Sequence, residues 1–311
     1  MAKIEVEHFT KDYGHGRGVF DISFQINKGE VYGFLGPNGA GKSTTIRHLM
    51  GFSKPDSGST RILGKETFGN TDKIMQSIGY LPGEIALPDG LSGYEFLDMM
   101  QKLKNVKDDT WVKYLLKLFE LDPSEDTKHM SLGIKRKLAV VTAFLNDPDI
   151  LILDEPTSGL DLKMQQVFIE FIKEEKRRGK TILLSSHIFS EVDATCDRIA
   201  IIKDGKIVSE FVANDLKHNN NKNYEIEFES HKEMLAFKQT TDGLKSIKIS
   251  GAVGNSLIVN INDEDINLLI KELSKYDIKS FVHIKETLED YFMKYYKEDK
   301  DFGGALWRKI L

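Results

Sequence analysis

The segment GPNGAGKST, residues 36–44, restricts the possible folds more than any other part of the chain. It fits the phosphate-binding loop pattern, in which a glycine and four further residues are followed by Gly-Lys-Ser/Thr. The apolar run VYGFLG at residues 31–36 predicts a buried strand before the loop, and a helix is expected to begin near Lys42. A strand, a glycine-rich loop and a helix in this order predict a nucleoside triphosphate site in an α/β fold.

Each residue type in this loop suits the binding of phosphate. Glycines allow backbone conformations that point N–H groups inward, and the following helix adds the positive end of its dipole. The Lys42 side chain is expected to reach the β- and γ-phosphates, and the Ser43 hydroxyl is expected to coordinate Mg²⁺. The residues expected to contact the nucleotide are Gly36, Pro37, Asn38, Gly39, Ala40, Gly41, Lys42, Ser43 and Thr44.

The bulk composition indicates a folded protein of two domains. The chain has 311 residues, of which 40% are hydrophobic and 29% are charged. Its formal net charge of −5 argues against gripping nucleic acid by bulk electrostatics, so no nucleic-acid partner is expected. The single cysteine, Cys196, excludes an internal disulfide and fits a reducing compartment.

The sequence contains no candidate membrane span. No apolar run approaches the ~20 residues that cross a bilayer, and the first residues carry charges where a signal peptide needs an apolar core. A function at a membrane would therefore require a second polypeptide.

Residues 1–213 alternate β-rich and helical stretches. The segments DILILD at 149–154 and TILLSSH at 181–187 predict two more buried strands. Buried strands that alternate with helices predict a largely parallel sheet with both faces covered. Residues 84–130 are expected to form a helical insertion, in which Phe96, Leu97, Met100 and Leu103 recur at helical spacing.

The remainder of the chain predicts a second, smaller domain. Residues 214–223 are polar and aperiodic, which is typical of a linker. Residues 224–311 are expected to form an α+β domain whose strand-helix-strand-strand-helix-strand order is ferredoxin-like, followed by a final helix in 287–297. The tail, residues 301–311, is partly apolar, and both packing on the domain and contact with a partner remain open.

Two acids and one histidine are candidates for the chemistry. Asp154 ends an apolar strand, so its carboxylate is expected at the ligand-binding edge of the sheet, where it would hold Mg²⁺. Glu155 follows and is a candidate to orient the attacking water. His187, after the strand at 181–186, is a candidate sensor of the γ-phosphate. The alternatives are a capping acid pair and a structural histidine.

The order of the motifs resembles that of the ATP-binding cassette (ABC) ATPases over residues 1–213. The phosphate loop and helical insertion precede MSLGIKRKL at 130–138, ILILDEP at 150–156, SGLD at 158–161 and SSH at 185–187. The resemblance implies an ATPase that uses ATP and Mg²⁺ and pairs head to tail with a second ABC subunit, as a homodimer or a heterodimer. It further implies that Ser131 and the Gly133 N–H act on the partner's nucleotide, that Tyr13 stacks on adenine and that Asp161 couples the two sites.

Two positions depart from the usual family pattern. Leu132 stands at the first glycine of Leu-Ser-Gly-Gly-Gln and adds a side chain to a crowded contact; Ser-Leu-Gly is similar to the form found in the bacitracin and lantibiotic self-protection branch. Gly83 and Glu84 follow Tyr-Leu-Pro, where most members have Gln. Since a carboxylate is a better Mg²⁺ ligand than an amide, Glu84 is a candidate metal ligand, and a solvated loop acid is the alternative.

Three uses of the ATP compete. The ending LEDYFMKYY at 288–296 is similar to that of ATPases paired with ABC-2-type permeases, which favours a subunit of a drug or toxic-peptide exporter. The alternatives are an importer subunit and a soluble, non-transport ABC protein. For the exporter, we expect a separately encoded integral-membrane permease that docks on the helical insertion, and a cytoplasmic chain held at the inner face of the membrane by that permease.

Overall fold

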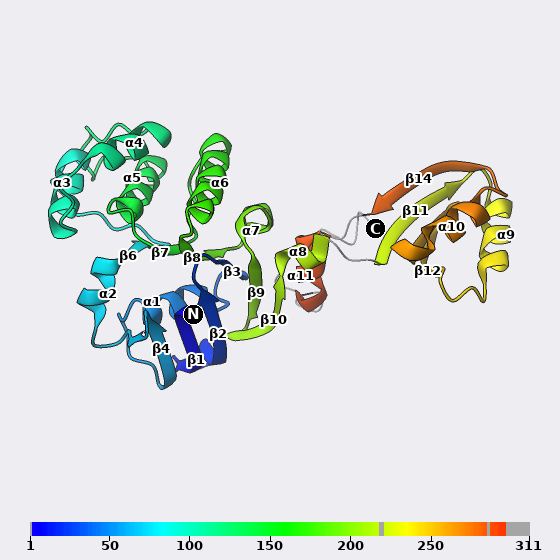
Figure 1. The fold of residues 1–311 in the computed structure, drawn as a ribbon, viewed down its shortest axis with the longest axis horizontal. Helices are drawn as coiled ribbons and strands as arrows, with labels where there is room; N and C mark the ends of the chain where they lie inside the picture. Colours follow the sequence, from blue (N-terminus) through cyan, green and yellow to red (C-terminus); the bar gives the residue numbers. More distant parts are fainter. Residues whose placement is uncertain (1, 218–220, 285–286, 297–311) are drawn as a thin grey trace. The chain divides into compact units, whose positions relative to one another are not determined.

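The computed structural model describes residues 2–217, 221–284 and 287–296. The chain splits into two compact units, Met1–Ala213 and Asn214–Leu311, and each is described here by itself (Figure 1). Within the described ranges, no helix is both long enough and apolar enough to cross a membrane.

The first unit contains two β-sheets. The smaller sheet is antiparallel, with strand order β2-β1-β4-β5. The larger has strand order β10-β9-β3-β8-β7-β6; its strands from β9 to β6 are parallel, and β10 is antiparallel to β9. The bounds are β1 Ala2–Asp12, β2 Gly18–Asn27, β3 Val31–Leu35, β4 Ser57–Ile62, β5 Lys65–Glu66, β6 Ile78–Leu81, β7 Ile150–Asp154, β8 Thr181–Ser186, β9 Arg198–Lys203 and β10 Lys206–Val212.

One hydrophobic core joins the two sheets. Helix α1 (Lys42–Leu49) contacts β2 and β4 of the smaller sheet and β7 of the larger one. Apolar side chains of both sheets and of α1 form a single buried cluster. Strands β3, β7 and β8 are therefore buried along their whole length, as their uninterrupted apolar sequences predict.

The expected helical insertion contains two helices, α3 (Gly93–Leu103) and α4 (Thr110–Leu118), and leads into α5 (Leu132–Phe144) (Figure 1). A capping box fixes the start of α3: the Ser92 hydroxyl accepts from the Glu95 backbone N–H, and the Glu95 carboxylate accepts from the Ser92 N–H. Phe96 and Leu97 are buried, whereas Leu103 is exposed. The helical spacing thus predicts the helix correctly, and its buried face includes Phe96 and Leu97 but not Leu103.

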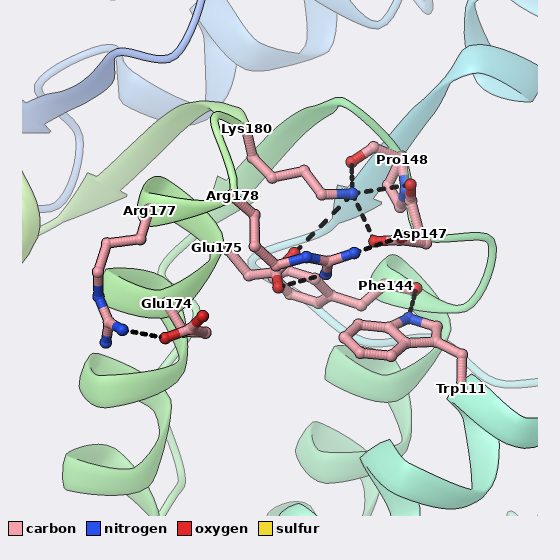
Figure 2. A network of polar contacts seen from close by, with 9 residues as sticks. All are labelled: Trp111, Phe144, Asp147, Pro148, Glu174, Glu175, Arg177, Arg178 and Lys180. Carbon is pink, nitrogen blue, oxygen red and sulfur yellow. Dashed lines mark hydrogen bonds and ion pairs between the residues drawn. The ribbon is translucent and has the colours of Figure 1, made fainter.

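A network of ion pairs connects this insertion to the end of α6 (Leu162–Arg177) (Figure 2). Arg178 forms ion pairs with Asp147 at 2.6 Å and with Glu175 at 2.7 Å. Its guanidinium also lies 4.8 Å from the ring centroid of Trp111 on α4. The indole N–H of Trp111 donates to the Phe144 carbonyl of α5 at 2.8 Å. Three helices therefore meet at one arginine.

Lys180 completes this network (Figure 2). Its ammonium pairs with the Asp147 carboxylate and donates to the backbone carbonyls of Asp147 and Pro148, both at 2.7 Å. Burial raises the pKa of Glu175, while the Arg178 hydrogen bond acts in the opposite direction. We name Asp147, Glu175, Arg178 and Lys180 the hinge network.

The remaining helices of the first unit are α2 (Thr71–Ser77) and α7 (Phe189–Thr195). Helix α7 contacts β3 and β8. The Cys196 thiol after it packs so closely on β3 that a Cβ at Gly33 would lie 2.8 Å from the sulfur. Burial raises the pKa of Cys196 to about 12, which fits a small core side chain rather than a reactive thiol.

The second unit has the expected ferredoxin-like fold. Its elements follow the order β11 (Asn221–Phe228), α9 (His231–Thr241), β12 (Lys248–Val253), β13 (Ser256–Asn262), α10 (Ile266–Leu273) and β14 (Ile278–Ile284). The strands form one antiparallel sheet of order β12-β13-β11-β14. Apolar residues of α9, α10 and the sheet share a separate core.

The structure corrects the expected linker at residues 214–223. Helix α8 (Ala213–Lys217) occupies its start, and strand β11 already begins at Asn221. The polar residues suit this strand because their side chains pair across the sheet: the Asn260 amide donates to Asn223, and Lys222 pairs with Asp263 at 2.7 Å. The final helix is α11 (Leu288–Tyr296); the tail at 301–311 lies outside the described residues.

Candidate active site

The phosphate loop lies between β3 and the start of α1. Gly39 and Gly41 have φ values of 84° and 113°, a region that favours glycine. Gly41 is the N-cap of α1, and no side chain caps the helix there. The N–H groups of the first turn are therefore available to an anion, as a phosphate loop requires. At the other end of the loop, a Cβ at Gly36 would lie 2.6 Å from the Ile202 carbonyl.

Lys42 lies under this loop and is 5% exposed. Its ammonium donates to the carbonyls of Gly36 at 2.6 Å and Pro37 at 3.2 Å. It also pairs with Glu155 Oε1 at 3.0 Å. The lysine is thus fixed at the mouth of the loop by two carbonyls and one carboxylate. Ser43 follows it in the first turn of α1 and is exposed.

Glu155 joins the lysine to the histidine. Its second carboxylate oxygen lies 2.7 Å from His187 Nδ1, and His187 is 48% exposed. The Glu155 backbone has a φ of 49°, unusual for a residue with a side chain. Its N–H donates to the Ser185 carbonyl of β8 at 3.0 Å. The structure therefore brings Lys42, Glu155 and His187 into one cluster, which we name the catalytic cluster after the role proposed for it below.

Asp154 ends β7 beside this cluster and is almost fully buried. Its carboxylate accepts a hydrogen bond from the Ser185 hydroxyl. It has no ion pair among the residues that the structure describes. A buried carboxylate without a cation is costly, which makes Asp154 a natural ligand for a metal ion. Burial, and secondly the Asp154 charge, raise the pKa of the neighbouring Tyr80 to about 12.

In the loop after β6, Gly83 lies next to the Asp154 carboxylate. A Cβ at Gly83 would lie 3.0 Å from Asp154 Oδ2, so a larger residue there would have to displace the carboxylate or the loop. Arg136 of α5 holds this loop by donating to the carbonyls of Pro82 at 3.1 Å and Gly83 at 2.7 Å. Burial lowers the pKa of Arg136. Glu84, the candidate metal ligand, is exposed.

The SLG segment lies at the start of α5. The Ser131 hydroxyl accepts from the Ile134 N–H at 3.3 Å and so caps the helix. A Cβ at Gly133 would lie 3.3 Å from the Gly159 carbonyl, and Leu132 packs on Gly159 while remaining 63% exposed. Within the described chain these contacts are with the SGLD segment and not with the phosphate loop.

Asp161 and Tyr13 lie apart from the catalytic cluster. Asp161 caps α6 by accepting from the Met164 N–H at 2.9 Å. Tyr13 lies in the hairpin between β1 and β2, and is half exposed with the Lys11 ammonium 5.8 Å from its ring. This hairpin ends at Gly18, whose carbonyl would lie 3.3 Å from a Cβ at Gly41. The Tyr13 loop therefore borders the phosphate loop.

Sequence reasoning missed several residues that position the site: Thr157, Ser185, Ser186, Glu191 and Arg136. Ser185 and Ser186 belong to the SSH motif, so their place beside the histidine was a usable signal. Glu191 follows the histidine by four residues and has the sequence of an ordinary acid in a first helical turn. Only the fold shows that it is buried.

Comparison with known proteins agrees with this geometry. Residues 19–158 match the family described as ABC transporter. The bacitracin transport ATP-binding protein BcrA of Bacillus licheniformis is 32% identical over 94% of this chain and 96% of its own length. The Nod factor export ATP-binding protein I of Burkholderia orbicola is 34% identical over 68% of this chain and 71% of its own length.

Solved structures show the same cassette. The structure of an ATP-binding subunit of an ABC transporter matches with a TM-score of 0.64 at 30% identity, covering 69% of this chain and 91% of that chain. The dimeric cassette MJ0796, bound to ADP and phosphate, has the same fold with a TM-score of 0.61 at 24% identity, over 68% of this chain and 98% of that chain. On this evidence the chain belongs to the ATP-binding proteins of ABC transporters, the family of cassettes that bind and hydrolyse ATP.

Proposed function

We propose that this chain is the ATP-hydrolysing subunit of an exporter and drives a permease encoded as a separate protein. The catalytic cluster at the phosphate loop is the observation that carries the hydrolytic part of the proposal. The export part rests on relatives whose names state bacitracin transport and Nod factor export. The first of these relatives is matched through the second unit as well, because it covers 94% of the chain.

ATP binding would rearrange the ion pairs of the cluster. Lys42 now pairs with Glu155, and a γ-phosphate with its larger charge would compete for the same ammonium. Glu155 would then be released to accept a hydrogen bond from the attacking water, with its carboxylate oriented by His187. Hydrolysis would depend on positioning and charge neutralisation, as is general for phosphoryl transfer.

The residues present fit Mg²⁺. No cluster of three or more His, Cys, Asp or Glu side chains suited to a metal exists among the described residues. Mg²⁺ in nucleotide sites is held by one or two protein oxygens and otherwise by phosphates and water. The unpaired Asp154 carboxylate and the exposed Ser43 hydroxyl are hard oxygen donors of this kind. They would hold the ion, which would neutralise charge on the phosphates. Glu84 is exposed and is proposed only as an additional, weaker ligand.

A second cassette would complete each site. Ser131 and Gly133 present an exposed helix start, with Leu132 protruding beside it, away from their own phosphate loop. In a head-to-tail pair of cassettes these groups would close over the γ-phosphate of the partner; the MJ0796 cassette, which has the same fold, is dimeric. Asp161 would lie near the same interface between the two cassettes. Tyr13 would stack on adenine beside the phosphate loop.

Transport in inverted membrane vesicles tests this function. The full chain is produced with a candidate permease, a multi-span membrane protein sought among the products of the neighbouring genes. Inverted vesicles are then given MgATP with bacitracin as the probe and a set of other peptide antibiotics. We expect ATP-dependent accumulation of at least one compound, and none with Glu155→Gln. An ATPase rate that is unchanged by the membrane protein, together with no accumulation, would contradict the exporter proposal while leaving ATP hydrolysis intact.

A further inference from the structure

Glu191, the third residue of α7, is a buried acid that the proposed chemistry does not use. It is 1% exposed, whereas an acid in the first turn of a helix normally faces water. Burial raises its pKa to about 7, and the Glu155 charge acts in the same direction. Placing a carboxyl group here costs free energy, so the contacts that it makes should explain its presence.

The first contact orients the segment around His187. The Ser186 hydroxyl donates to Glu191 Oε2 at 2.6 Å and at the same time accepts from the Ile188 N–H at 3.0 Å. Because the hydroxyl hydrogen is committed to Glu191, a lone pair of the oxygen is free for Ile188. His187 therefore lies within a turn that the Ser186 side chain closes by accepting from the Ile188 N–H, and the hydrogen bond to Glu191 orients that side chain.

The second contact is with the segment that carries Glu155. The buried Thr157 side chain lies close enough to the Glu191 carboxyl to lower its pKa, although Glu191 Oε1 has no hydrogen-bond partner among the described residues. Two residues earlier, Glu155 has a left-handed backbone and pairs with His187 at 2.7 Å. One carboxyl group thus accepts a hydrogen bond from the residue before His187 and lies near the turn after Glu155.

We infer that Glu191 is a positioning residue for ATP hydrolysis. It holds the Glu155 and His187 side chains in their positions relative to each other. The inference rests on the proposed catalytic roles of those two residues. Glu191 touches neither phosphate nor water in this account. It acts through Ser186 and Thr157, so its loss should move the reacting groups without removing any of them.

The test compares Glu191→Ala with Glu191→Gln in the full chain. Alanine removes the acceptor, and a misplacement of catalytic groups by about 1 Å costs ~10²-fold in rate. We expect kcat to fall by about that factor while KM for ATP and the Kd of a fluorescent ATP analogue change less than about twofold. The amide oxygen of glutamine still accepts from Ser186, so Glu191→Gln should retain most of the activity.

A matched control is Glu175→Gln, because Glu175 is equally buried at 1% exposure but belongs to the hinge network. It should leave kcat unchanged at a temperature where the protein is folded. Should Glu191→Ala fail to fold, Ser186→Ala removes the same hydrogen bond with a smaller change in volume and should lower kcat in the same way.

Two results would overturn the inference. One is wild-type kcat in both Glu191→Ala and Ser186→Ala, and the other is a rise of KM that accounts for the whole loss. Activity retained in Glu155→Gln would instead contradict the catalytic assignment on which the inference rests, so the two failures are distinguishable.

Discussion

The catalytic cluster and the hinge network are built from the same kinds of residue but are suited to different tasks. Each contains a lysine that is 5% exposed, donates to two backbone carbonyls and forms an ion pair with a carboxylate. Each contains an acid with positive φ, Glu155 at 49° and Asp147 at 47°. Neither burial nor backbone conformation therefore distinguishes a site from a structural cluster.

The difference lies in charge balance. In the hinge network two cations, Arg178 and Lys180, face two acids, Asp147 and Glu175. At the phosphate loop Lys42 pairs with Glu155, which also contacts the His187 imidazole, while Asp154 accepts only from a hydroxyl and has no ion pair among the described residues; the Arg136 guanidinium interacts with both acids without an ion pair to either. The start of α1, which no side chain caps, adjoins the catalytic cluster and not the hinge network. A balanced set of charges stabilises the fold, whereas an unbalanced one leaves a place for a nucleotide and its cation.

The largest expected effect follows from Glu155→Gln. The amide keeps the volume but loses the charge that pairs with Lys42 and orients water, so kcat should fall by ~10²–10³-fold. ATP binding should persist, because the loop and Lys42 are untouched. Steady-state hydrolysis and equilibrium binding of an ATP analogue measure the two effects. Glu175→Gln, the same change in the balanced cluster, should not alter kcat, and equal losses in both would remove the distinction.

Asp154→Asn should weaken the metal site. Asp154 is buried and has no ion pair among the described residues, so replacing it should raise the Mg²⁺ concentration for half-maximal activity by about tenfold or more. Mn²⁺ binding in the presence of ATP, followed by electron paramagnetic resonance, gives a readout independent of turnover. Unchanged Mn²⁺ affinity would show that Asp154 does not hold the ion.

Glu175→Ala should act on stability instead. It leaves Arg178, which is 35% exposed, with Asp147 as its remaining acid partner, and losing a hydrogen bond to a charged group costs about 1.5–3 kcal/mol. Denaturant unfolding should therefore show a lower midpoint, while kcat per folded molecule stays at the wild-type value. A loss of kcat without a loss of stability would assign the hinge network a catalytic role.

Trp111→Phe is the mildest change. It removes the 2.8 Å hydrogen bond to the Phe144 carbonyl but keeps an aromatic ring under Arg178. The expected cost is about 1 kcal/mol, seen as a small decrease of Tm with unchanged ATP hydrolysis. Trp111→Leu, which also removes the cation–π contact, should cost more, and an equal Tm for the two variants would show that the ring contributes nothing.

How much the sequence predicts depends on how far apart in the sequence the contacting residues lie. The phosphate loop, Asp154 and His187 were predictable because each follows a buried strand directly, and parallel strands end at a common edge. The hinge network and Glu191 were not, because their partners lie up to 34 residues away, as between Thr157 and Glu191, and only the fold brings them together.

One omission and one error have local causes. The smaller sheet was not predicted: Ile4 and Val6 alternate with Glu5 and Glu7 as in a half-buried strand, but a register shift between Val6 and Phe9 breaks the alternation in β1. Residues 221–223 were predicted to be linker because three polar residues carry no period, yet they pair with β13 along the whole strand. Backbone pairing and cross-strand polar contacts can outweigh a polar composition.

A complementation assay tests the shared-site account most directly. Lys42→Ala removes the phosphate-binding lysine. Ser131→Trp blocks the segment 131–133, the lid that closes over the partner's γ-phosphate. A chain with either change alone should be inactive. Mixed in equal amounts, they should regain ATP hydrolysis, because a mixed pair contains one site with an intact loop and an intact lid. Two inactive chains that stay inactive when mixed, under conditions where the Glu155→Gln chain forms an ATP-bound dimer, would contradict it. So would full activity of the Ser131→Trp chain by itself.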